Sequence, residues 1–282
     1  MTNVAWCTDV HLDFLDNRTN EIVAFGESLI KDNPDVVLIT GDISIANSLV
    51  YHLSALERVV QRPVYFVLGN HDFYGGGIEH VRKEMKELGN SSQYLKYLPT
   101  TPYVALSSTT GLVGHDGWYD TGYGNVKASN FIMNDWIRIS DYVNEGAMGG
   151  VSMYGGHAPN YAKIVTISKK LAHEATVHVM NGIKAAVRYH KVILIATHFP
   201  PFEEAHVYNG QKGDAAHQPW YTNKMMGDMI KQAAAAYPKV RFEVFAGHTH
   251  GKFDGQIANN LYCHVGGAEY NDPKLQNVIK VP

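Results

Sequence analysis

Polar side chains that can bind a metal ion or move a proton follow five short apolar runs of this 282-residue chain. The runs are residues 4–7, 36–39, 64–68, 192–196 and 242–246. The polar residues after them are carboxylates, imidazoles and one amide: Asp9, His11, Asp42, Asn70, His71, Asp72, His198, His248 and His250. Carboxylate, imidazole and amide oxygen suit Zn²⁺, Mn²⁺ or iron. The set is too large for one ordinary ion, so it favours two ions that share a bridging carboxylate.

Each block has a plain structural explanation when it is taken alone. Asp9 and His11 can lie in a surface loop, and Asp42 can lie in an ordinary turn. Asp72 can cap the helix that follows it. Two histidines between glycines, at residues 247–251, are unusual for a plain turn. Because every block follows a predicted strand, the five blocks together favour a site of chemistry.

The elements that must position these residues are strands alternating with helices. The apolar runs are short and rich in β-branched and aromatic residues, which predicts strands covered on both faces. Residues 19–31, 47–60 and 77–88 show helical spacing between the early strands. This alternation predicts βαβ units and sheets with parallel strands. Ligands bind beyond the carboxyl ends of such strands, so the polar residues are expected at one edge.

The middle of the chain shows a different pattern. Residues 103–113 predict two short strands around a turn, and the Gly-rich residues 146–156 predict a loop. Residues 161–189 and 221–236 return to helical spacing, and residues 255–282 predict closing strands. With no repeat or linker evident, we expect one domain over residues 1–282, with a possible cap or long-loop insertion at about 114–160.

Composition argues against partners that are held by bulk charge or by a bilayer. The net charge is −3, and the 24 Lys and Arg residues are scattered along the chain. No stretch approaches about 18 consecutive apolar residues, and the N-terminus does not resemble a signal peptide. Two cysteines cannot build a disulfide framework, so we expect a cytoplasmic protein.

The order of the blocks resembles the calcineurin-like metallophosphoesterase superfamily. Asp-x-His, Gly-Asp, Gly-Asn-His-Asp, His and Gly-His-x-His occur in that order from residue 4 to about 251. The resemblance implies an α/β fold, a four-layer α/β/β/α sandwich of two mixed sheets, with a dinuclear metal site at the strand C-terminal ends. It implies that one ion is bound by Asp9, His11, Asp42 and His250, and the other by Asp42, Asn70, His198 and His248. It also implies that His71 is the catalytic histidine and Asp72 its orienting acid.

The resemblance further implies the hydrolysis of phosphoric esters. A metal-bound hydroxide would attack the phosphorus of a small phosphomonoester or phosphodiester in line with the leaving group. His71, which is spare in the ligand set, would stabilise the transition state or protonate the leaving alkoxide. Two divalent or mixed-valence ions, of Mn, Zn or Fe, are the expected cofactors.

Departures from the patterns of particular subfamilies narrow the expected class of substrate. The protein Ser/Thr phosphatases continue the second block with acid-arginine-glycine and follow Asn-His with arginine. Here Ile43 and Ser44 follow Asp42, and Asp72 follows His71. The stretches at 8–14 and 197–202 are more similar to the small prokaryotic phosphoesterases and phosphodiesterases. A small-molecule phosphate ester is therefore the expected partner.

Loops beyond the five blocks are expected to contact the substrate. The segment with His115, Trp118 and Tyr119 follows a predicted strand, and its aromatic rings could stack on a base or sugar or else pack beneath a loop. His206 and Tyr208 lie on the loop that begins at His198 and could reach the substrate or simply face solvent.

Three other functions stay open beside a phosphoesterase. A nuclease of the same superfamily would need a basic groove, which the scattered cations do not suggest, so a nucleic-acid partner is not expected. A catalytically silent binding protein would not need both His71 and Asp72 beside an intact ligand set. A metal-dependent amidohydrolase usually carries its His-x-His early in the chain, whereas here it comes last.

Overall fold

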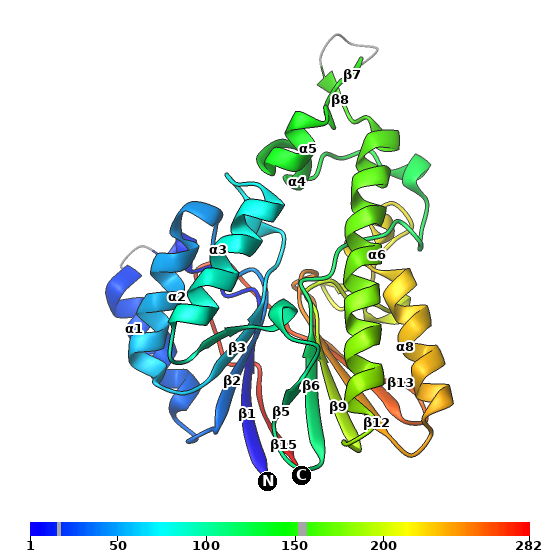
Figure 1. The fold of residues 1–282 in the computed structure, drawn as a ribbon. Coiled ribbons are helices and arrows are strands. Elements are labelled where there is room, and N and C mark those ends of the chain that lie inside the picture. The colour runs from blue at the N-terminus through cyan, green and yellow to red at the C-terminus, as the bar shows by residue number, and fades with distance from the viewer. Residues whose placement is uncertain (16–17, 152–156) are drawn as a thin grey trace.

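Two β-sheets pack face to face at the centre of this computed structural model, which describes residues 1–15, 18–151 and 157–282 (Figure 1). The first sheet has the strand order β15-β1-β2-β3-β4. Its strands are β1 (Thr2–Cys7), β2 (Val36–Thr40), β3 (Val64–Val67), β4 (Leu95–Tyr97) and β15 (Asn277–Val281). Strands β1 to β4 are parallel, and β15 pairs antiparallel with β1.

The second sheet has the order β13-β14-β12-β9-β6-β5. Its strands are β5 (Val104–Ala105), β6 (Thr110–Gly114), β9 (Val192–Ala196), β12 (Arg241–Ala246), β13 (Phe253–Ala258) and β14 (Leu261–Val265). The four inner strands are parallel, and the two edge strands β5 and β13 pair antiparallel with their neighbours. The predicted mixed sheets are therefore confirmed.

Helices cover the outer face of each sheet (Figure 1). The first sheet is covered by α1 (Arg18–Ile30), α2 (Ala46–Val60) and α3 (Ile78–Ser91), and the second by α6 (Tyr161–Ala186) and α8 (Lys224–Ala236). Strand β1 shows why the layers form: Val4 and Trp6 point to the other sheet, while Ala5 and Cys7 point to the helices. Both faces of the strand are apolar, so burying both gives the predicted four-layer sandwich.

The segment between β6 and α6 stands beyond the carboxyl ends of the strands (Figure 1). It contains α4 (Asp135–Arg138), α5 (Ser140–Asn144) and the paired strands β7 (Gly150–Val151) and β8 (His157–Ala158). Residues 150 and 151 are thus a strand rather than the predicted loop, and residues 152–156 lie outside the described residues. Trp118 and Trp136 are fully buried and belong to the same core cluster as the first sheet, so this segment packs onto that core.

Shorter elements complete the chain. They are the 3-10 turns Leu12–Phe14, His71–Phe73, Leu98–Thr100, Val126–Ala128 and Glu203–Ala205, the hairpin β10 (Val207–Tyr208) and β11 (Gln211–Lys212), and α7 (Gln218–Tyr221). In the part of the chain that the structure describes, none of the helices combines the length and apolar character needed to cross a bilayer.

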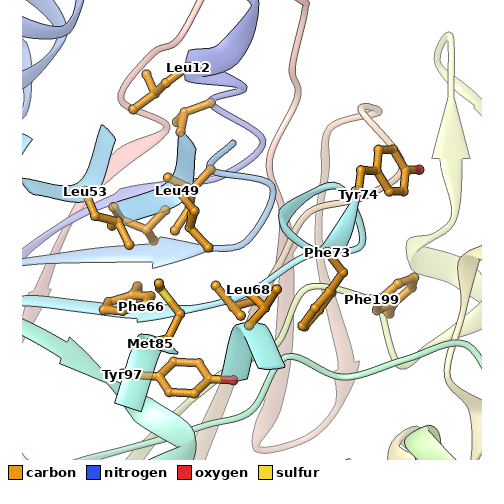
Figure 2. Packing of buried hydrophobic residues seen from close by; sticks show 14 of the residues in the cluster. Leu12, Leu49, Leu53, Phe66, Leu68, Phe73, Tyr74, Met85, Tyr97 and Phe199 are labelled. Carbon is orange, nitrogen blue, oxygen red and sulfur yellow. The ribbon is translucent and has the colours of Figure 1, made fainter. Parts of the chain in front are cut away.

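The loop after β3 rests directly on the core. Leu68 and Phe73 stand on either side of the Asn-His-Asp stretch, and both side chains are fully buried (Figure 2). The ring of Phe73 packs edge-on against Trp118, with 5.8 Å between ring centroids. This packing anchors the loop that carries residues 70–72.

Candidate metal centre

Five of the predicted ligands have left-handed backbone conformations that non-glycine residues rarely adopt. Their φ angles are 49° for Asp9, 41° for His11, 51° for Asp42, 70° for His248 and 55° for His250. Each of them follows the end of a parallel strand, where the chain must turn sharply. Such backbone strain, of order 1–3 kcal/mol per residue, is typical of functional sites.

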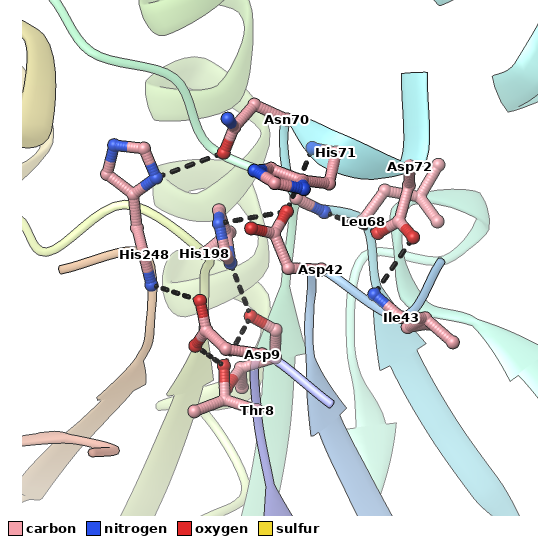
Figure 3. Close-up of polar contacts among 12 residues, drawn as sticks. Thr8, Asp9, Asp42, Ile43, Leu68, Asn70, His71, Asp72, His198 and His248 are labelled. Carbon is pink, nitrogen blue, oxygen red and sulfur yellow. Dashed lines mark hydrogen bonds and ion pairs between the residues drawn. The ribbon is translucent and has the colours of Figure 1, made fainter. Parts of the chain in front are cut away.

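Backbone hydrogen bonds join the turns of the two sheets. The N–H of Asp9 donates to the carbonyl of Gly41 over 3.0 Å, and the N–H of Gly247 donates to the carbonyl of His198 over 2.9 Å. Across the sheets, the N–H of His248 donates to Oδ1 of Asp9 over 2.9 Å (Figure 3). The strand ends of both sheets are thereby held around one point.

The first group of converging side chains is Asp9, His11, Asp42 and His250, whose potential ligand atoms lie within 4.8 Å of one another. Nε2 of His11 lies 3.2 Å from Nε2 of His250 and 3.8 Å from Oδ2 of Asp42. Nε2 of His250 lies 3.5 Å from Oδ1 of Asp9. These are the four residues predicted for one ion.

The second group is Asp42, His198 and His248, which also converge within 4.8 Å (Figure 3). Nδ1 of His198 donates to the carbonyl of Thr40 over 2.9 Å, which leaves Nε2 facing Oδ1 of Asp42 at 3.3 Å. Nε2 of His248 donates to the carbonyl of Trp220 over 3.3 Å, and its Nδ1 lies 3.0 Å from Oδ1 of Asn70. The structure thus brings together all seven predicted ligands.

The donor atoms of both groups fit metal ions. When Nε2 of His248 carries the ring proton, the lone pair of Nδ1 faces the amide oxygen of Asn70, so two acceptors point at each other. A cation between such acceptors relieves their repulsion, and oxygen and imidazole are ligands of Zn²⁺, Mn²⁺ and iron. The two groups could hold two ions that share Asp42.

Burial and mutual charge shift the pKa values of these groups. Burial lowers the pKa of His11 to about 3 and that of His248 well below its usual range. Burial also opposes ionisation of Asp42 and of His198, but their attraction for each other outweighs it. The pKa of Asp42 therefore falls well below its usual range, and that of His198 rises to about 9. A negative charge on Asp42 between the two groups is what a bridging ligand requires.

His71 lies beside the metal groups without belonging to either of them. Its backbone N–H donates to Oδ1 of Asp42 over 2.9 Å. Its ring lies 4.6 Å from that of His11 and 4.4 Å from that of Tyr74, and it lines the cavity above the ligands. Burial lowers the pKa of His71. The position suits a group that meets the substrate.

Asp72 has a different role from the predicted one. Its Oδ1 accepts hydrogen bonds from the N–H groups of Ile43 and Ser44 over 2.9 and 2.8 Å, and its Oδ2 accepts one from Gly69 over 2.8 Å. The prediction that Asp72 orients the ring of His71 is therefore wrong. The alternative of a cap on the helix that follows Asp72 is also wrong, because these bonds join the loops after β2 and β3. A Cβ at Gly69 would collide with Oδ1 of Asp42, which explains the glycine.

A cavity of about 690 Å³ opens above the metal groups. His206 and Tyr208, two of the predicted substrate contacts, lie in its wall. The other described lining residues are Asp42, Asn70, His71, Tyr74, Phe131, Ile132, Met133, Asn134, Gln211, Lys212, Asp214, His217, Tyr221, His248, Thr249, His250 and Tyr270. A larger hollow of about 960 Å³ lies between α3, α5 and α6, and its described lining includes none of the predicted site residues.

The other three predicted substrate contacts are buried. The ring N–H of Trp118 donates to the hydroxyl of Tyr142 over 2.7 Å, and the hydroxyl of Tyr119 accepts from Trp136 over 3.1 Å. Nδ1 of His115 accepts from the N–H of Gly117 over 3.3 Å. The predictions that Trp118, Tyr119 and His115 touch substrate are therefore wrong, because Trp136 and Tyr142 of the following segment pack against the two aromatic rings and His178 of α6 packs against His115.

Sequence reasoning missed Asp135, which is fully buried next to the metal groups. It accepts hydrogen bonds from the amide of Asn70 over 2.9 Å and from the hydroxyl of Tyr74 over 2.7 Å. Burial raises the pKa of Asp135 to about 6. Tyr74 lies four residues after Asn70, so a local pattern could link these two residues. Asp135 lies 65 residues after Asn70, so no local pattern could link it to the site.

Comparisons with known proteins agree with this geometry. The family model for calcineurin-like phosphoesterases matches residues 2–252. A phosphopantetheinyl hydrolase from Mycobacterium tuberculosis has a similar structure, with a TM-score of 0.65 and 12% identity over 95% of this chain and 90% of that one. A dimetal phosphatase from Danio rerio has a TM-score of 0.55 and 11% identity over 94% and 87%.

The same fold also occurs in the anchor in the inner membrane complex of Plasmodium, with a TM-score of 0.51 and 13% identity over 99% of this chain and 77% of that one. No curated protein matches the chain. At these identities the structural neighbours establish the fold, and the family model establishes the relationship. The chain belongs to the calcineurin-like phosphoesterase family.

Proposed function

We propose that this protein is a dinuclear metal-dependent phosphoesterase that hydrolyses a small phosphomonoester or phosphodiester. The observation that carries the proposal is the position of Asp42 between two sets of ligands. Its Oδ2 faces His11 of the first group, and its Oδ1 faces His198 of the second, at 3.8 and 3.3 Å. One carboxylate with an oxygen toward each group is the arrangement that a two-metal site uses.

The ions, when bound, lower the pKa of coordinated water and neutralise the phosphoryl oxygens. The protein supplies the remaining parts. Asn70 contributes a neutral amide oxygen, which adds no negative charge to a site that a phosphate must approach. A water that has lost one proton to the solvent would form a bond from its oxygen to phosphorus as the bond from phosphorus to the alcohol oxygen breaks. His71 would give a proton to that leaving oxygen and regain one from the solvent.

Manganese, zinc and iron are the candidate ions, because the ligands are imidazoles, carboxylates and an amide. Both cysteines are buried free thiols, Cys7 in one core cluster and Cys263 in another. Two cysteines that are free thiols support a reducing, cytoplasmic setting.

A substrate screen on metal-reconstituted protein tests the proposal. Purified protein is stripped of metal, loaded with Mn²⁺, Zn²⁺ or Fe²⁺, and assayed on nitrophenyl phosphate, bis-nitrophenyl phosphate and a nucleotide panel. We expect hydrolysis that requires metal and that rises until two ions per chain are bound. Tight binding of two ions with no hydrolysis of any ester would favour a catalytically silent binding protein instead.

A further inference from the structure

The wall of the active-site cavity beyond the metal groups mixes polar residues with an apolar and aromatic part. Phe131, Ile132, Met133, Tyr208 and Tyr221 belong to the apolar and aromatic part. The side chains of Ile132 and Tyr208 are 51% and 61% exposed. Such large apolar surfaces beside a catalytic group are available to a ligand.

Tyr221 links this wall to the metal groups. Its ring lies 4.8 Å from that of His248 and is stacked on that of His206 at 5.1 Å, with only 4° between the ring planes. The leaving group of a phosphate ester bound at the metal groups would therefore lie near the ring of Tyr221 if it pointed to this side of the cavity. Tyr270 also lines the cavity, with 5.1 Å between its ring and that of His250.

The cavity offers little positive charge beyond the ions. Lys212 is the single Lys or Arg among the described lining residues, and it is paired with Glu203 at 2.9 Å. The one acid at the rim, Asp214, is paired with His217 at 2.8 Å. A second phosphate on the leaving group would need cationic partners, typically Arg or Lys. Within the described lining, the wall supplies Lys212 alone, and that ammonium is already paired with Glu203.

Building on the proposed function, we propose that the leaving alcohol of the substrate is uncharged and apolar or aromatic. It packs against the wall of Phe131, Ile132, Met133, Tyr208 and Tyr221 while the phosphate lies at the metal groups. A volume of about 690 Å³ accommodates a small molecule of this kind. Pyrophosphate and nucleoside triphosphates are poor substrates by the same reasoning.

A series of 4-alkylphenyl phosphates tests this wall on the metal-loaded full chain. Lengthening the alkyl group from methyl to propyl to pentyl adds apolar area and hardly changes the acidity of the phenol. We expect kcat/KM to rise about two- to fourfold per buried methylene. Calorimetric titration of the matching phosphonates, which cannot be hydrolysed, should show the same trend in Kd.

Two exposed isoleucines provide a matched pair of variants. Ile132 lines the cavity, whereas Ile137 is equally exposed, at 51%, on α4 and does not line it. We expect Ile132→Ser to flatten the dependence on chain length and Ile137→Ser to retain it. An equal dependence of kcat/KM on alkyl length in both variants, or no such dependence in the unaltered protein, would contradict the proposed packing of the leaving alcohol on this wall. Failure to hydrolyse any ester would instead overturn the proposed function, and phosphonate binding would still report on the wall.

Discussion

The carboxylate of Asp135 accepts a 2.9 Å hydrogen bond from the amide nitrogen of Asn70. The same oxygen accepts a bond from the hydroxyl of Tyr74, which itself lies 3.0 Å from that amide nitrogen. Because the nitrogen is held on this side, the amide oxygen faces His248 and the second metal group. The segment between β6 and α6 thus positions a predicted ligand that comes from the loop after β3.

Replacing Asp135 should weaken metal binding at the second group. Without Asp135, the side-chain amide of Asn70 can rotate and present its N–H groups to the cation. We therefore expect Asp135→Ala to lower the affinity for one ion about 10–100-fold. Titration of metal-free protein with Mn²⁺, followed by electron paramagnetic resonance, measures this. Asp141→Ala is the control, because Asp141 lies in the same segment and accepts from the N–H of Ile78 instead. Equal affinities in the two variants would contradict the assignment.

Asp42→Ala should lose bound metal and activity together. The carboxylate faces both groups, so its removal takes a ligand from each ion. Elemental analysis of the purified variant should show less than one ion per chain. Unchanged metal content would show that Asp42 does not bridge.

His71→Ala should keep both ions and lose rate. The ring lies outside both metal groups, and proton transfer by such a side chain contributes roughly 10²–10⁴-fold. We expect this loss in kcat with the metal content of the unaltered protein. The loss should shrink with substrates whose leaving groups need no proton. Loss of bound metal from His71→Ala would show that His71 is itself a metal ligand.

Arg82 should matter for stability far more than its exposed neighbour Lys83. Its Nε donates to Oδ2 of the fully buried Asp116 over 2.9 Å. The other oxygen of Asp116, Oδ1, accepts from the N–H of Leu68. Asp116 therefore links the loop after β6 to α3 through Arg82 and to the loop after β3 through Leu68. We expect Arg82→Met to cost about 3–5 kcal/mol in the free energy of unfolding, because it leaves a buried carboxylate without its cation.

Urea unfolding compares Arg82→Met with Lys83→Met. The ammonium of Lys83 lies 4.0 Å from Glu87 on the exposed face of α3, and such a pair contributes at most about 1 kcal/mol. Similar losses in both variants would show that the buried pair stabilises the fold no more than the exposed pair does.

Buried His115 should make the metal-free protein less stable in acid. Burial lowers the pKa of His115 to about 3, whereas the unfolded chain binds this proton near pH 6.5. The unfolded state therefore gains protons first as the pH falls. The contribution of His115 to stability is complete above pH 6.5 and is lost at about 1.4 kcal/mol per pH unit from there toward pH 3.

The measurement is the difference in unfolding free energy between the unaltered protein and His115→Asn. Between pH 7.5 and pH 5.0 this difference should shrink by about 2 kcal/mol. A constant difference over this pH range would place the ring of His115 in contact with water.

The sequence alone predicted the strands that carry the ligands, the covering helices and the blocks of ligand residues. Each ligand block is local: an apolar run, then a turn, then a donor such as Asp9 or His248. Parallel strands bring their carboxyl ends to one edge, so the pattern along the chain becomes a cluster in space. That is why all seven predicted ligands meet.

Tertiary structure decided what lies around those ligands. Trp118 was indistinguishable in sequence from an exposed stacking ring, and only the fold of the following segment buries it. Asp72 sits beside His71 in the chain, yet its oxygens bind the backbone of Ile43, Ser44 and Gly69. Asp135 reaches Asn70 from 65 residues away. Periodicity and spacing report interactions between near neighbours, whereas burial and hydrogen-bond partners depend on segments that only folding brings together.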